Sequence, residues 1–144
     1  MWRPLGLLPA AIVLVVILPA TRLAGTRAAT APAPADVARG DYLVHNVAMC
    51  VQCHTPRTHD GVLLMDQQLH GAPMPVKSPY ANTPFAFAAP HIAGLPAGWP
   101  EEEFVHFLQT GDPGDRPKPQ PPMPPFRMNE ADARAIAAYL KTLR

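Results

Sequence analysis

The chain is poor in cysteine, in charge and in any pattern typical of β-strands. Only two of its 144 residues are cysteine and 16% are charged, with twelve basic against eleven acidic residues. Two cysteines allow at most one disulfide and leave no further thiols to complete a zinc site. No basic stripe or arginine cluster is present, so we do not expect a nucleic acid as a partner. The length favours one domain over two, and the sequence has no internal repeats.

The only long apolar run lies at the N-terminus. A charged start, Met1–Arg3, precedes the apolar stretch 5–18, and small residues with scattered arginines follow it. This layout is typical of a secretory signal, and the stretch is shorter than the roughly 20 residues of a membrane-spanning helix. We therefore expect a signal peptide or N-terminal anchor over residues 1–28, a linker over 29–35 and a folded domain over 36–144. The domain should lie in the periplasm, or at the outer face of the inner membrane if the leader stays uncleaved and provides membrane association.

Removing that leader changes the sign of the net charge. It contains Arg3, Arg22 and Arg27, so nine basic residues remain against eleven acidic ones, a net charge of −2 with histidine neutral. The small charge and the 20 prolines are slightly more typical of a docked subunit than of a freely diffusing protein.

Three segments carry the apolar spacing of helices. The first starts at Asp36 and runs into the cysteine pair. Its predicted buried side holds Val37, Gly40, Val44, Val47, Ala48 and Val51. The second covers Glu101–Leu108, with Pro100 at its first position, glutamates in its first turn and Gly111 as its C-terminal cap. The third begins at the N-cap Asn129. Its predicted buried side holds Ala135, Ile136, Tyr139, Leu140 and Leu143.

Proline interrupts the remaining sequence. Residues 56–99 contain no long periodic segment, and residues 112–125 contain seven prolines. Such segments cannot form helices or central strands, so we expect loops. A loop as long as 56–99 in a compact domain makes sense if the chain wraps a large apolar cofactor. The predicted fold class is all-α, with three or more helices and long proline-rich loops.

The sequence Cys50-Val51-Gln52-Cys53-His54 matches the Cys-x-x-Cys-His pattern of covalent haem attachment. Two thiols at this spacing can bond to the two vinyl groups on one haem edge, and the imidazole then lies beneath the iron. A thiol redox motif would need a strand–helix setting, which the sequence does not show. A zinc site would need a second pair at motif spacing, which is not formed by His45, His59, His70, His91 and His106. A plain disulfide is the other alternative. We predict one haem c, anchored by Cys50 and Cys53, with His54 as an iron ligand.

Met123 is the predicted second iron ligand. It lies within Pro121–Pro125, and prolines on both sides restrict the loop before folding, so less entropy is lost in placing the sulfur. A thioether ligand is common in electron carriers and raises the reduction potential. The rival ligands are Met74, which also lies between prolines, Met128, and His91, which would give a bis-histidine site.

On these residues the chain resembles a class I c-type cytochrome over about residues 36–144. The resemblance rests on Gly40-Asp41-Tyr42, the haem motif Cys50–His54, Gly94-Leu95-Pro96 with Trp99, Glu101–Gly111, Met123-Pro124 and Tyr139-Leu140. It implies a class I cytochrome c fold around one covalent haem, with the first and last helices crossing and Gly40 against the Tyr139 region. It also implies that a middle-loop residue, Trp99 or Tyr80, hydrogen-bonds the haem propionates. The segment Asp60–Pro90 carries no family landmark.

The resemblance implies an electron carrier rather than an enzyme. The ends of the domain are similar to bacterial periplasmic cytochromes that serve as electron-accepting subunits of dehydrogenases. We therefore expect one-electron transfer between redox proteins, the partner being a dehydrogenase, an oxidase or another cytochrome. Two alternatives stay open: a haem-based small-ligand sensor or enzyme with an open distal site, and a subunit whose main role is docking within a larger dehydrogenase.

Overall fold

The computed structural model describes residues 33–143, so the predicted leader over 1–28 lies outside the described residues. Within 33–143, no helix is long and apolar enough to cross a membrane. The elements in chain order are α1 (Pro34–Tyr42), the π-helix η1 (Leu43–Val47), α2 (Cys50–His54), the 3-10 helix η2 (Met65–Gln67), β1 (Ala72–Pro73), β2 (Ala88–Ala89), α3 (Glu101–Thr110) and α4 (Glu130–Leu140).

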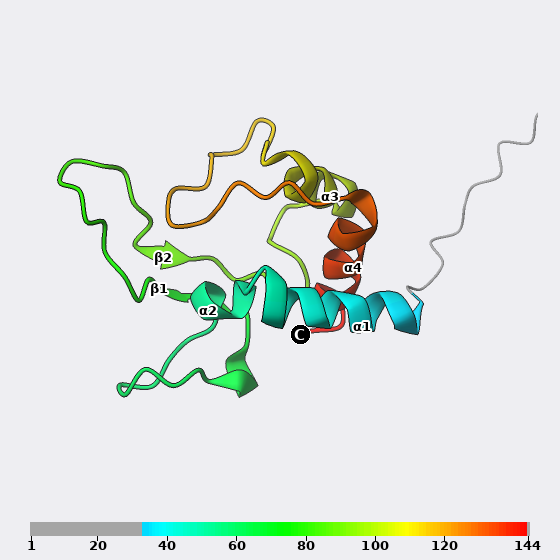
Figure 1. The fold of residues 1–144 in the computed structure, drawn as a ribbon, viewed down its shortest axis with the longest axis horizontal. Helices are drawn as coiled ribbons and strands as arrows, with labels where there is room; N and C mark the ends of the chain where they lie inside the picture. Colours follow the sequence, from blue (N-terminus) through cyan, green and yellow to red (C-terminus); the bar gives the residue numbers. More distant parts are fainter. Residues whose placement is uncertain (1–32, 144) are drawn as a thin grey trace, which may run out of the picture. The chain divides into compact units, whose positions relative to one another are not determined.

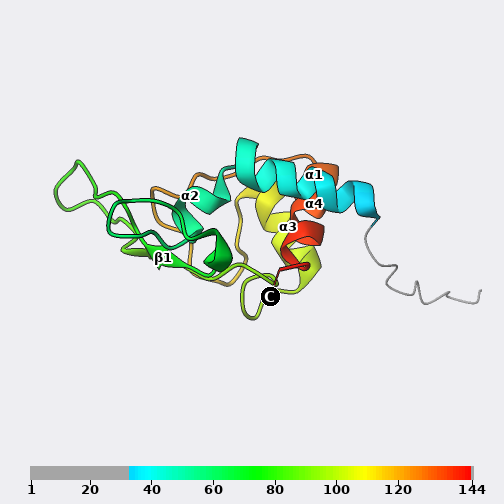
Figure 2. The same cartoon turned by 90° about the horizontal axis from the view of Figure 1, so that it is seen from below.

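The three longer helices pack together, and the short elements lie at the other end of the domain. Figures 1 and 2 both place α1, α3 and α4 side by side, with α2 and β1 beyond the end of α1. The buried apolar residues of these helices form one core cluster, which Leu69 and Ile92 from the long middle segment also join. The fold is mostly helical, as predicted, and its two strands are only two residues each.

The first predicted helix forms but changes its hydrogen-bonding pattern halfway. It begins at Pro34, two residues before the expected boundary, where the missing amide hydrogen of proline is tolerated. In η1 the amide of Ala48 donates to the carbonyl of Leu43 at 2.8 Å, a π-type bond. The extra residue in this turn rotates the apolar stripe. Leu43 is therefore buried, whereas Val47, expected on the buried side, is 57% exposed.

The crossing of α1 and α4 depends on the small size of Gly40. A Cβ atom added there would lie 2.0 Å from the carbonyl oxygen of Ala135 and 2.7 Å from the Cβ of Tyr139. Such distances leave no room for a side chain, so the backbones of the two helices are in direct contact. The expected close approach of Gly40 to the Tyr139 region is confirmed. At the edge of this crossing, the Arg39 guanidinium donates to Asp132 at 2.9 Å.

Helix α3 buries Phe104, Phe107 and Leu108, as predicted. Pro100 has ψ of 144° and so lies one position before the helix, as its N-cap, rather than at its first residue. Gly111 ends the helix in the left-handed conformation, with φ of 68°, and its amide donates to the Phe107 carbonyl at 2.7 Å. Glycine suits this cap because it adopts a positive φ without steric cost.

Helix α4 starts at the predicted cap. The side-chain oxygen of Asn129 accepts a hydrogen bond from the amide of Asp132 at 2.8 Å. Leu143 lies beyond the end of the helix and is half-buried. The other predicted core residues of this helix are buried, namely Ala135, Ile136, Tyr139 and Leu140.

The loops are those expected, with one addition. Residues 112–125 contain neither helix nor strand. In the segment 56–99, however, β1 and β2 pair antiparallel, with Ala72 opposite Ala89. No strand was expected there, because two-residue strands are too short to show an alternating pattern. This pairing lies next to α2 (Figure 1) and brings the middle segment against the cysteine motif.

Candidate functional site

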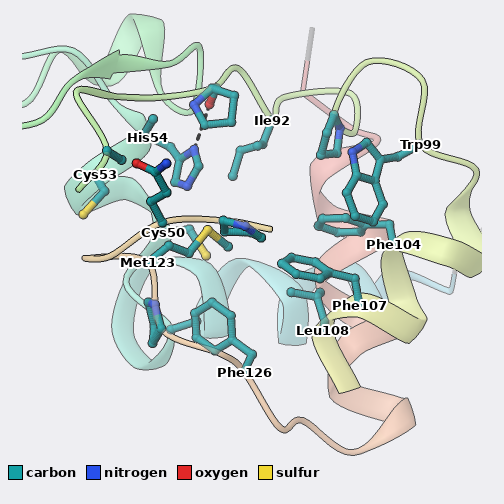
Figure 3. Close-up of a pocket in the computed structure, with 18 of the residues that line it drawn as sticks. Cys50, Cys53, His54, Ile92, Trp99, Phe104, Phe107, Leu108, Met123 and Phe126 are labelled. Atoms are coloured by element: carbon teal, nitrogen blue, oxygen red, sulfur yellow. Dashed lines mark hydrogen bonds between the residues drawn. The ribbon is translucent and has the colours of Figure 1, made fainter. Parts of the chain in front are cut away.

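A cavity of about 630 Å³ lies between α2, the middle segment, α3 and the proline-rich loop. Sites for drug-sized ligands and cofactors span about 300–1,000 Å³ and are mostly apolar, so this cavity has the size and lining of such a site. Figure 3 shows the cysteines, His54 and Met123 gathered on one side, with Trp99 and the side chains of α3 on the other. Its apolar wall includes Ile92, Phe104, Phe107, Leu108, Phe126, Ile136 and Leu140.

Cys50 and Cys53 both line this cavity as free thiols on the single turn of α2. Met49 precedes them in the left-handed conformation, with φ of 53°, and so separates α2 from the π-helix. Burial raises the pKa of the Cys50 thiol to about 11, and Cys53 adds to the shift. Thiols that act in redox exchange have lowered pKa values, so this environment is unlike that of a thiol redox centre.

His54 is the last residue of α2 and is only 6% exposed. Its Nδ1 donates a hydrogen bond to the carbonyl oxygen of Pro90 at 2.8 Å, drawn as a dashed line in Figure 3. Burial lowers the pKa of His54, against the opposing effect of the Pro90 carbonyl. The neutral ring therefore keeps its proton on Nδ1, and Nε2 carries a free lone pair, as a metal ligand requires.

The strand pairing behind α2 positions the Pro90 carbonyl. The amide of Gly71 donates to the carbonyl of His54 at 2.8 Å, so the segment leading into β1 is bonded directly to the end of α2. Gly71 has φ of 86°, and a Cβ there would lie 2.8 Å from the amide nitrogen of His91 and 3.0 Å from the carbonyl carbon of Pro90. Sequence reasoning missed both Gly71 and Pro90, because a backbone amide that donates and a backbone carbonyl that accepts have no sequence signature of their own.

Two of the predicted candidates for the second iron ligand line the cavity, Met123 and Met74. Met123 comes from the proline-rich loop and packs against the core cluster. Met74 follows β1, on the same backbone pairing that carries Pro90, because its amide donates to the carbonyl of Phe87 at 2.9 Å. Met123 thus approaches from a segment separate from the one that orients His54.

The other two rivals lie outside the cavity lining. Met128 packs against the core cluster, and its amide donates to the carbonyl of Leu108 at 3.1 Å. The imidazole of His91 instead contacts His70, with ring centroids 4.7 Å apart.

The cytochrome c family model matches residues 37–144 of the chain. This match covers three quarters of the sequence and includes every residue that lines the cavity. The chain belongs to the cytochrome c family.

A curated relative of this cytochrome is a protein from Cereibacter sphaeroides named "Diheme cytochrome c-type". The two are 31% identical over 108 residues, which are 72% of this chain but only 34% of the relative. The chain therefore spans about a third of the relative's length. Members of the family bind haem c covalently and carry electrons. The predicted class I fold is confirmed.

The residues around the cavity fit a haem. A neutral imidazole nitrogen, a thioether and two free thiols lie around an apolar space, which matches the donors that hold the iron and the edge of haem c. His54 lies on α2, whereas Met123 lies on the proline-rich loop between α3 and α4.

One edge of the cavity carries a positive charge that the sequence did not reveal. The Arg116 guanidinium lies 4.4 Å from the ring centroid of Trp99 and donates to the Gly98 carbonyl at 2.9 Å. It also forms an ion pair with Glu103. Of the two predicted propionate partners, Trp99 lines the cavity, whereas Tyr80 lies outside it and is 72% exposed. Stacking on Trp99 is a long-range contact, which is why the arginine was not singled out.

Proposed function

We propose that this cytochrome carries one haem and moves single electrons between redox proteins outside the cytoplasm, as the electron-accepting subunit or partner of a dehydrogenase. The observation that carries the proposal is the neutral, buried imidazole of His54 at a cavity that also receives the thioether of Met123. A haem bound there would supply a one-electron iron couple. The chain's own residues would hold it, exclude water and set its potential.

Each predicted site residue has one role in this proposal. Cys50 and Cys53 would hold the haem covalently through their thiols. His54, through the lone pair of Nε2, and Met123, through its sulfur, would bind the iron. The apolar lining and the thioether ligand both favour the reduced iron, so we expect a higher potential than for an exposed bis-histidine haem.

The cysteine content supports one haem in this sequence. Both cysteines of the 144-residue sequence belong to the single motif at Cys50–His54, so no second covalent attachment is available in it. The name of the diheme relative describes that longer protein.

Export and the dehydrogenase partner rest on the sequence. The charged and apolar start of the chain supports a periplasmic location, or one at the outer face of the inner membrane if the leader is retained. Partial exposure of the cavity rim supports contact with a partner, because Met49 lines the cavity and is 48% exposed. Electrons would pass most directly where such a rim meets another redox protein.

The test compares the absorption spectra of wild type, Met123→Ala and the matched control Met74→Ala, each matured with haem in an export-competent host. We expect wild type and Met74→Ala to show the weak near-red band of an iron–thioether bond and Met123→Ala to lack it. Carbon monoxide should bind the reduced Met123→Ala protein and not the wild type. If Met74→Ala lost the band and Met123→Ala kept it, the iron ligand would be Met74 and the assignment of Met123 would be wrong. Carbon monoxide binding to wild type would favour a sensor or enzyme with an open distal site.

A further inference from the structure

Two histidines far apart in the sequence form a contacting pair outside the haem cavity. The rings of His70 and His91 lie 4.7 Å apart, centroid to centroid, at an interplanar angle of 85°. Both residues are exposed, and neither lines the cavity. The haem site described above makes no use of either side chain.

The backbone fixes these two residues opposite each other. Ala72 pairs with Ala89, and beyond the end of this pairing the amide of Ile92 donates to the carbonyl of Leu69 at 2.9 Å, so the two segments are bonded on both sides of the histidines. His70 and His91 occupy the facing positions between these two pairs. The ring centroids are 4.7 Å apart, so the two imidazoles lie within reach of one ion.

Each ring also has one nitrogen occupied by a backbone carbonyl. Nδ1 of His70 lies 2.9 Å from the carbonyl oxygen of Gln68, and Nε2 of His91 lies 2.9 Å from that of Ala93. A carbonyl accepts only, so these two nitrogens carry the ring protons. In the neutral rings, the lone pairs therefore belong to Nε2 of His70 and Nδ1 of His91. Histidines that bind metals are commonly held in this way, through a hydrogen bond from the other nitrogen.

We propose that His70 and His91 bind one divalent transition-metal ion, of the zinc type, through these two free nitrogens. Imidazole nitrogens suit such ions, with zinc–nitrogen bonds of about 2.0–2.1 Å. Within residues 33–143, no group of three or more His, Cys, Asp or Glu side chains is placed to hold a metal. Water therefore completes the coordination, and the ion exchanges with solvent.

The site lies next to the residue that orients His54. His91 follows Pro90, whose carbonyl accepts the His54 Nδ1 hydrogen bond, and His70 precedes Gly71, whose amide donates to the His54 carbonyl. A bound dication adds positive charge beside this strand pair, which disfavours the oxidised haem. Metal binding should then raise the reduction potential. This coupling rests on the proposed haem ligation, whereas the metal site itself does not.

The first experiment is calorimetric titration of the haem-loaded wild type with Zn²⁺ alone. We expect one Zn²⁺ per chain, with binding weakened at least tenfold in His70→Ala and in His91→Ala. The matched control is His59→Ala, which removes another exposed histidine and should bind as wild type does. Unchanged haem spectra in all variants establish that they are folded. Equal binding by wild type and both pair variants, or loss of binding in His59→Ala, would overturn the site.

The second experiment measures the midpoint potential with and without saturating Zn²⁺, a redox-inactive ion. We expect an upward shift in wild type that is absent in His70→Ala. A potential that does not move although Zn²⁺ is bound would overturn the coupling to the haem. A protein that binds Zn²⁺ with this stoichiometry but lacks the iron–thioether band would keep the metal site and refute the ligand assignment of Met123.

Discussion

Substitution of Gly40 by alanine tests the helix crossing on which the fold depends. The added methyl group would lie 2.0 Å from the Ala135 carbonyl oxygen, about 1.4 Å short of ordinary contact at 3.4 Å. The obstacle is helix backbone, which cannot rotate away as a side chain would. Overpacking of this kind costs about 1–3 kcal/mol, and the better helix propensity of alanine returns about 1 kcal/mol. Because α1 must move away from α4 and loosen Ile136 and Tyr139, the cost should lie at the upper end of this range, about 3 kcal/mol, which leaves a net loss of about 2 kcal/mol.

The assay is denaturant and thermal unfolding of the haem-loaded protein, followed by far-ultraviolet circular dichroism. For a domain of this size, a loss of about 2 kcal/mol lowers Tm by roughly 10 °C. The control is Gly61→Ala, because Gly61 has φ of 83° but nothing within 4 Å of an added Cβ. It should cost only the backbone strain of about 1 kcal/mol. A Gly40→Ala protein as stable as wild type, or more stable than Gly61→Ala, would refute the contact between the helices.

Two further predictions concern the strand pair and the alkaline limit of stability. Gly71→Ala should destabilise the fold by about 1–3 kcal/mol and weaken the hydrogen bond from His54 to Pro90. A weaker bond makes the imidazole less basic, so voltammetry should show a raised potential, and an unchanged potential would contradict this role. Burial and a neighbouring carboxylate raise the pKa of Tyr139 to about 12, above its ordinary value of 10.0. Its contribution to stability is therefore complete below about pH 10 and lost as the pH rises towards 12. Unfolding measured between these pH values should show less pH dependence in Tyr139→Phe than in wild type or in the exposed control Tyr80→Phe.

Local signals were sufficient to predict the helices and their caps. Asn129 and Gly111 cap the helices for which they were chosen, because capping depends on residues within one turn of the helix end. The π-helix could not be predicted in this way. Its amides donate to carbonyls five residues back rather than four, a difference that no residue type signals, and the exposed Val47 is the consequence.

Contacts between residues far apart in the sequence could not be predicted from it. The Cys-x-x-Cys-His motif identified Cys50, Cys53 and His54 as site residues, and all three line one cavity with Met123 in the structure. The sequence did not indicate that a carbonyl 36 positions away would orient His54. It also placed the five other histidines in no pair, because strand pairing rather than spacing brings His70 and His91 together.

The two sides of the cavity are held by different physical means. The carbonyl of His54 accepts a hydrogen bond from the Gly71 amide, and its ring donates one to the Pro90 carbonyl. The predicted covalent anchors lie on the same helix. The loop of Met123 has no predicted covalent anchor. The Ala86 amide donates to its Pro121 carbonyl at 2.8 Å, and the Met123 amide donates within the loop, to the Gln120 carbonyl at 3.2 Å. Its prolines compensate, because they reduce the freedom that the loop would gain on opening. The missing covalent anchor should outweigh this effect, so local opening should begin on the methionine side, and the near-red band should disappear at lower denaturant concentration than the helical signal.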